Sequence, residues 1–191
     1  IEAGSNKNKD LIKAAEAALN EAVKYAKQGT KLGEIGKAIH DTIKGYGFSP
    51  VKNLSGHGLD EYLVHHGITI PNYDNNDNKK LEEGMKIAIE PFATNGKGLV
   101  TEGKPSGIYS IDNVRPIRNF DARKLLVHIH EQYKTLPFSI RWIDFKNVNF
   151  LIRLLEKEGI LRSHPVLVEE SKGLVSQAEH TIIVGKGITT I

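Results

Sequence analysis

Three candidate metal ligands lie on three short apolar segments that are far apart in the sequence, so only a fold that brings these segments together can unite them. His57 follows a serine and a glycine, Glu90 ends a short alternating run, and Glu179 lies in an otherwise apolar segment near the C-terminus. A glutamate in such a setting is seldom buried unless it is paired or bound to a metal. One imidazole and two carboxylates suit a hard-to-intermediate divalent cation and leave coordination positions open for water. These residues predict a hydrolytic metal site, although their spacing alone is a weak signal.

Size and composition limit the class of protein. The 191 residues are enough for one large domain, or for one domain with a smaller insert. Hydrophobic residues make up 39%, charged residues 26%, and the net charge is +3, which is too balanced to predict a nucleic-acid partner or a membrane surface. No apolar run reaches the roughly 18 residues of a membrane-spanning helix. The absence of cysteine excludes disulfides, and with no secretory signal visible at the start we expect a cytoplasmic protein.

Two amphipathic helices are predicted at the start, over residues 8–29 and 31–44. Apolar residues recur at helical spacing in both segments, and Gly29 and Gly45 suit the two helix ends. Strand patterns follow directly after the second segment. We therefore expect both helices to pack over one face of a sheet.

Three strand candidates have recognisable patterns. Residues 85–90 alternate at period two and end before a proline, which is typical of a strand. Residues 108–111 are a further strand candidate. The last strand, over residues 177–184, is expected to return to the main sheet.

The pattern changes between residues 120 and 170. Helices are predicted over residues 122–133 and 148–158, and a hairpin is predicted between residues 166–168 and 174–175. The order of two helices and a hairpin resembles a small winged-helix-like insert.

Two histidines after the first candidate ligand compete for one role. His57 and His65 lie eight positions apart, and an even offset places two side chains on the same face of a strand. A glycine-containing turn between them weakens this inference. His66 is the alternative, but the spacing from His57 favours His65.

Five ordered motifs carry a resemblance to a known family. They are Asn53-Leu54-Ser55-Gly56-His57, Tyr62-Leu63-Val64-His65-His66-Gly67, Ile89-Glu90-Pro91-Phe92-Ala93, Leu136-Pro137-Phe138 with Arg141-Trp142, and Glu179-His180-Thr181-Ile182. Together they resemble type II methionine aminopeptidases, and the short loops are most similar to the archaeal form. The resemblance runs from about Gly4 to the C-terminus, and several ordered motifs are far more specific than any single one.

The resemblance implies a fold and a domain division. The fold class is α/β (α+β): the pita-bread aminopeptidase fold, with two pseudo-symmetric halves around a two-metal site. Residues 1–110 and 176–191 then form the metallopeptidase domain, incomplete at its N-terminus. Residues 111–175 form the small helical, winged-helix-like insert of the type II enzyme.

The resemblance also implies the ligand set. The family uses two aspartates, one histidine and two glutamates, and His57, Glu90 and Glu179 match the last three. The two aspartates belong to the upstream half, and the second is expected a handful of residues before Ile1. We therefore expect this chain to be the C-terminal portion of the enzyme and to be inactive alone.

The implied activity is removal of N-terminal methionine from nascent polypeptides by two-metal peptide hydrolysis. The two divalent ions are cobalt, manganese, iron or zinc, because all four tolerate such ligands. By resemblance, Glu90 ligates metal and shuttles the proton, and His65 hydrogen-bonds the scissile peptide and stabilises developing charge. Val64 and Phe92 match positions that line the methionine pocket. The implied substrate has a small second residue.

Two positions depart from the family pattern. His164 stands where the family usually has a tyrosine beside the substrate pocket, and Ala178 stands where it usually has a phenylalanine. The first change bears on side-chain preference, and the second on packing beside Glu179. The implied partners are nascent peptide N-termini, the ribosome, and the upstream half, either as part of the same protein or as a separate complementing chain.

Two other functions remain as alternatives. A non-catalytic protein of the same fold can bind a ribosome or another partner, but such relatives typically lose ligands, whereas all three visible here are intact. A proline-specific dipeptidase of the same superfamily would suit Gly56-His57-Gly58. The Asn53-Leu54-Ser55 motif and the insert favour the type II methionine aminopeptidase instead.

Overall fold

The computed structural model describes residues 8–190, which form two compact units. The first, here the sheet unit, comprises residues 8–60, 64–101 and 168–190. The second, here the helical unit, comprises residues 61–63 and 102–167. No helix within the described part of the chain has both the length and the apolar character to cross a membrane.

Two helices open the sheet unit, as the periodicity predicts. They are α1 (Lys9–Val23) and α2 (Leu32–Gly45). Helix α1 ends earlier than the predicted residue 29 because its last turn tightens: the N–H groups of residues 24–26 donate to carbonyls three positions back. The second helix has nearly the predicted bounds.

Two small sheets complete this unit. The five-stranded sheet has the order β11-β10-β4-β2-β3, and the three-stranded sheet has the order β1-β5-β9. Their strands are β1 (Ser49–Pro50), β2 (Ser55–Gly58), β3 (Thr69–Pro71), β4 (Lys86–Ile89), β5 (Phe92–Thr94), β9 (Val175–Gln177), β10 (His180–Ile183) and β11 (Gly187–Ile188). The strands predicted over residues 85–90 and 177–184 are thus confirmed within the sheets.

One antiparallel register links the two sheets. The pairs run from Lys86 opposite Ile183 in β4 and β10 to Thr94 opposite Val175 in β5 and β9, without a slip. Pro91 lies where the first strand gives way to the second, and proline has no N–H to donate to a ladder. The register is the same on both sides of the unpaired residues 90–91 and 178–179, and we call residues 86–94 together with 175–183 the central ladder.

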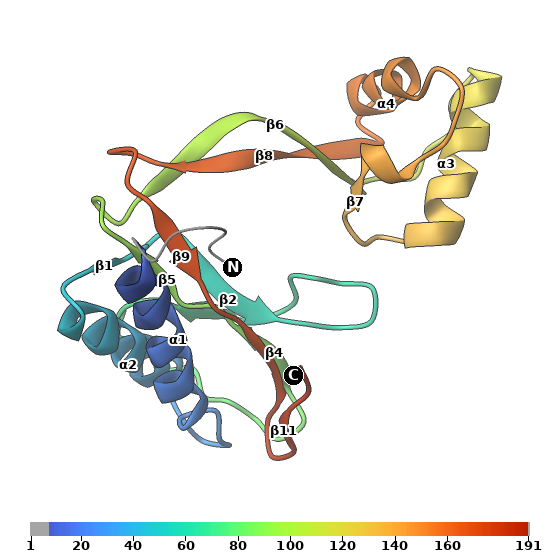
Figure 1. Ribbon diagram of the computed structural model, residues 1–191. Helices are drawn as coiled ribbons and strands as arrows, with labels where there is room; N and C mark the ends of the chain where they lie inside the picture. The colour runs from blue at the N-terminus through green and yellow to red at the C-terminus, as the bar shows by residue number, and fades with distance from the viewer. Residues whose placement is uncertain (1–7, 191) are drawn as a thin grey trace. The chain divides into compact units, whose positions relative to one another are not determined.

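The core of the sheet unit lies between the helices and the strands. Helices α1 and α2 pack on each other, α2 lies against β1 and β3, and α1 lies against β5 and β9 (Figure 1). The fully buried side chains come from both layers: Leu32, Ile35, Ile39, Ile43, Ile70, Leu81, Ile87 and Ile89. The predicted packing of both helices against the strands is confirmed, but the strands they contact belong to two sheets and not to one.

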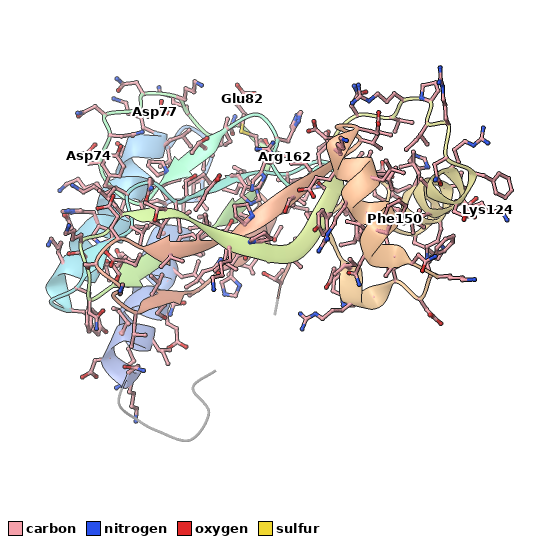
Figure 2. All side chains as sticks on the ribbon, turned by 90° about the horizontal axis from the view of Figure 1, so that it is seen from above. Asp74, Asp77, Glu82, Lys124, Phe150 and Arg162 are labelled. Atoms are coloured by element: carbon pink, nitrogen blue, oxygen red, sulfur yellow. The ribbon has the colours of Figure 1, made fainter. Side chains whose placement is uncertain are left out.

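The helical unit has its own core. It contains β6 (Val100–Ile111, entering from the sheet unit), α3 (Phe120–Tyr133), β7 (Phe138–Ser139), the short 3-10 helix η1 (Ile140–Trp142), α4 (Val148–Lys157) and most of β8 (Leu161–Glu169). Phe138 is fully buried, and its ring stacks on Tyr133 at 5.2 Å between centroids. Both predicted helices are confirmed, with exposed side chains such as Lys124 and Phe150 pointing away from them (Figure 2).

The predicted hairpin between residues 166–168 and 174–175 is wrong. Strand β8 lies beside β6, whereas β9 pairs with β5. The chain turns away because Thr94 and Asn95 bind both backbone groups of Leu174: the Thr94 hydroxyl donates to its carbonyl and the Asn95 amide oxygen accepts its N–H. Assignment of residues 111–175 to the type II insert remains a prediction.

Candidate metal centre

The candidate ligands come from three neighbouring strands, and the register places them on one sheet face. His57 in β2 and Thr181 in β10 are both paired with Ala88 in β4, so these three side chains point to the same side. Because side chains two positions apart on a strand share a face, Glu90 and Glu179 point to that side as well. The central ladder also sets Glu90 directly opposite Glu179.

His57 and Glu90 are in direct contact. The imidazole Nε2 lies 2.9 Å from Glu90 Oε1, and each side chain is only 12% exposed. The other ring nitrogen, Nδ1, lies 3.0 Å from the carbonyl oxygen of Gly58, which can only accept. A neutral imidazole that donates through Nδ1 has a lone pair at Nε2. Two acceptors then face each other, and only a proton or a cation between them makes the contact favourable.

The same geometry is typical of metal-binding histidines. They generally donate the second ring N–H to a backbone carbonyl or a carboxylate, which fixes the tautomer and aims the other nitrogen at the metal. His57 makes this arrangement with Gly58. A divalent cation can therefore take the place of the proton between Nε2 and the carboxylate of Glu90.

The Glu90 carboxylate has opposing influences. Burial raises its pKa, and the negative charge of Glu179 raises it further, while the charge of His57 and the hydrogen bonds of Gln177 and His57 lower it. The side-chain amide of Gln177 donates to Glu90 Oε2 at 2.7 Å. Like charges directly opposite each other on a sheet are unfavourable, so this pair of carboxylates also favours a bound cation.

His65 lies beside His57, outside the strand. Their rings meet edge to face, with centroids 4.3 Å apart and planes at 75°. The two histidines converge because residues 59–67 form a loop that returns to β2, whose Gly58 accepts the backbone N–H of His66 at 2.8 Å. The contact favours His65 over His66 as the functional histidine, and its role in catalysis remains a prediction.

The three predicted substrate-pocket residues lie in both units. Val64 is half-buried next to His65, and Phe92 is half-buried in β5. His164 belongs to the helical unit, where its Nε2 lies 2.9 Å from Ser110 Oγ. Burial lowers the pKa of the His164 imidazole, and the charge of Arg162 lowers it further. The substrate contacts of these three residues remain predictions.

The donor set fits a divalent cation but does not form a closed cage. Within residues 8–190, no group of three or more histidine, aspartate and glutamate side chains stands ready to hold a metal ion. Two donors, His57 and Glu90, touch each other, and Glu179 faces the second across the ladder. Imidazole and carboxylate oxygen are ligands for manganese, iron, cobalt and zinc.

Sequence reasoning missed Gln177. The Gln177 amide donates a hydrogen bond to the second carboxylate oxygen of Glu90. Gln177 lies two positions before Glu179, so the side chains of Gln177 and Glu179 share a face. The alternation that placed Glu179 on the ligand face would also have placed Gln177 there.

Comparisons with known proteins find relatives among archaeal enzymes. The chain is 51% identical over 184 residues to a methionine aminopeptidase from Archaeoglobus fulgidus, covering 96% of this chain and 63% of that protein. It is 43% identical over 191 residues to one from Methanocaldococcus jannaschii, covering 97% of this chain and 65% of that protein. The chain thus spans less than two thirds of these curated relatives.

Solved structures share the fold at low sequence identity. A thermophilic Arx1 has a TM-score of 0.78 at 18% identity, covering 94% of this chain and 56% of that one. Methionine aminopeptidase from Rickettsia prowazekii has a TM-score of 0.62 at 22% identity, covering 98% of this chain and 54% of that one. The pita-bread fold expected from the motifs is confirmed by these neighbours. A family model, that of metallopeptidase family M24, matches residues 2–186, and the chain therefore belongs to metallopeptidase family M24.

Proposed function

We propose that this chain is the larger, C-terminal part of a methionine aminopeptidase that removes N-terminal methionine from nascent polypeptides. The observation that carries the proposal is the shared sheet face, where Glu90 lies between His57 at 2.9 Å and the opposing Glu179. The identity of 40–51% to archaeal methionine aminopeptidases supports the same activity. The substrates would be peptides with a small second residue, in the cytoplasm, and the ribosome would be a further partner.

The residues of this chain would supply one side of a two-metal site. His57, Glu90 and Glu179 would hold two divalent ions, together with two aspartates from the upstream half. The ions, when bound, polarise the scissile carbonyl and bring the pKa of water towards neutrality. Glu90 would carry the proton, because its pKa is already raised by burial and by Glu179. His65 would hydrogen-bond the scissile peptide.

The test uses a polypeptide extended at its N-terminus to the length of the relatives. With Mn²⁺, Co²⁺, Fe²⁺ or Zn²⁺ added in turn, it should release methionine from a Met-Ala or Met-Gly peptide. A chelator should abolish release, and Glu179→Ala should abolish it as well. Full activity in the presence of the chelator would refute the proposal.

A matched control separates loss of a ligand from loss of a charge. Glu82→Ala removes an exposed carboxylate before β4 (Figure 2), and it should leave methionine release unchanged. Two further substrates test the alternatives. Cleavage of an Xaa-Pro dipeptide in place of the methionine peptides would indicate a proline-specific dipeptidase. Metal-free binding to ribosomes without any peptidase activity would indicate a non-catalytic protein.

A further inference from the structure

A buried carboxylate outside the candidate metal centre has an unusually full set of donors. Glu169, at the end of β8, is 3% exposed. Its Oε1 accepts the backbone N–H groups of Lys97 and Gly98, and its Oε2 accepts those of Ser171 and Gly173 together with the Ser171 hydroxyl. The Ser171 hydroxyl and these backbone groups lower the pKa of the Glu169 carboxyl to about 2.

These donors belong to two turns that close the central ladder. Lys97 and Gly98 follow β5, and Ser171 and Gly173 precede β9. The ladder ends at the pair of Thr94 and Val175. Glu169 therefore joins the segment that follows β5 to the segment that precedes β9, immediately beyond the last pair. Hydrogen bonds to an ionised carboxylate are roughly twice as strong as neutral ones.

The turns are packed against the carboxylate without spare room. A Cβ added to Gly96 would lie 2.3 Å from the Glu169 carboxylate carbon. One turn therefore needs glycine at this position for the carboxylate to reach both backbones.

The candidate metal centre lies on this same ladder. Glu90 and Glu179 are four residue positions from its closed end, which is about 13 Å at the usual rise of a strand. A register shift of one residue would turn one side chain of the pair to the opposite sheet face. The same shift would separate Gln177 from Glu90.

We propose that Glu169 is a positioning residue whose buried carboxylate locks the register of the central ladder, and thereby holds Glu90 opposite Glu179 and within reach of Gln177. The assignment deepens the proposed function and rests on it for its link to metal binding. Its physical core, the lock on the register, is independent of any reaction.

The test compares two neighbouring glutamates in the extended polypeptide. Glu169→Gln keeps the size of the side chain but replaces one acceptor with a donor. Glu170→Gln makes the same change of charge at an exposed neighbour. We expect backbone amides of β9 and β10 to exchange hydrogen at least about tenfold faster in Glu169→Gln than in Glu170→Gln, because a closed ladder limits local opening. Mn²⁺ affinity, measured by calorimetry, should fall by at least about tenfold in the first variant only.

A third variant separates positioning from simple loss of stability. Ile39→Val removes a methyl group from the core under α2 and destabilises without touching the turns. At matched melting temperature, faster ladder exchange and weaker Mn²⁺ binding in Glu169→Gln alone support the lock. Equal exchange and equal affinity in the two variants would overturn it.

A milder change keeps the test decisive if Glu169→Gln does not fold. Ser171→Ala removes the hydroxyl that donates to Glu169 and also accepts the N–H of Lys97. All four backbone N–H groups that donate to Glu169 stay in place, Lys97 included, so the carboxylate loses one hydrogen bond. The loss of one hydrogen bond should speed ladder exchange by roughly threefold to tenfold, and an unchanged rate would overturn the proposal. If the unaltered polypeptide releases no methionine, the proposed function fails, while the exchange measurements still decide the lock.

Discussion

Replacing Gly58 with alanine should disturb the candidate metal centre through a single steric contact. Gly58 follows His57 in β2 and accepts the N–H of His66. A Cβ at this position would lie 2.0 Å from the carbonyl oxygen of His66. Since its backbone angle φ is not positive in the structure, the effect of alanine comes from this close approach and not from backbone strain.

The size of the disturbance follows from the contact. Unbonded heavy atoms approach comfortably to about 3.5 Å, so the loop or the strand must move by about 1.5 Å. Overpacking of this kind costs about 1–3 kcal/mol, against a total of about 5–15 kcal/mol for a typical domain. The loop also carries His65, whose ring lies against His57. A displacement of about 1 Å in a catalytic group can lower the rate by about 100-fold.

The measurement is made on the extended polypeptide. Urea unfolding reports the stability change, and kcat/KM for a Met-Ala peptide reports the displacement. Gly45→Ala is the matched control, because a Cβ there meets no atom within 4 Å and alanine stabilises a helix by up to about 1 kcal/mol over glycine. If Gly58→Ala unfolds like the unaltered protein and keeps kcat/KM within about threefold, the steric reasoning is wrong.

Three further predictions, with four substitutions, test other parts of the molecule. His65→Ala should lower kcat/KM by roughly 100-fold or more, whereas His66→Ala should stay within about tenfold, as measured by peptide hydrolysis. Glu90→Gln should raise the melting temperature of the metal-free protein at neutral pH. Folding raises the pKa of the Glu90 carboxyl, so its contribution to stability is present below the unfolded pKa and is lost as pH rises through the folded pKa. Glutamine is neutral at every pH and avoids this loss. The gain should vanish in acid, and a gain that is equal at all pH values would contradict this reasoning. Phe138→Ala should lower the free energy of unfolding by about 3–5 kcal/mol, because it removes a fully buried ring. Fluorescence of the single tryptophan, which lies in the same unit, measures this unfolding.

Most of the elements could be predicted from periodicity. The stripes of α2, α3 and α4 and the alternation before Glu90 correspond to observed helices and to β4. Local patterns of this kind suffice wherever an element buries one face against a layer of its own unit. The end of α1 was harder, because helix termini are decided by a few hydrogen bonds in the final turn.

The failed hairpin shows where local reasoning stops. Residues 166–168 and 174–175 look like two strands around a turn. Leu174 instead forms hydrogen bonds with Thr94 and Asn95, and Thr94 lies 80 positions before it in the chain. No local pattern reveals a partner at that distance. The same holds for Glu169, whose acceptors are filled partly by backbone groups, and backbone groups have no signature in the sequence.

The buried carboxylate of Glu169 explains how the central ladder can keep the carboxylates of Glu90 and Glu179 opposite each other. An unpaired ladder would relieve the repulsion between Glu90 and Glu179 by fraying at Pro91, where one backbone donor is already missing. The five donors around Glu169 hold the far end closed, and the pairing of β4 with β10 holds the near end. Separation of the strands therefore does not relieve the repulsion between the two carboxylates, whereas a cation bound between them does. A site built in this way binds metal more tightly because its strands are held together before the metal arrives.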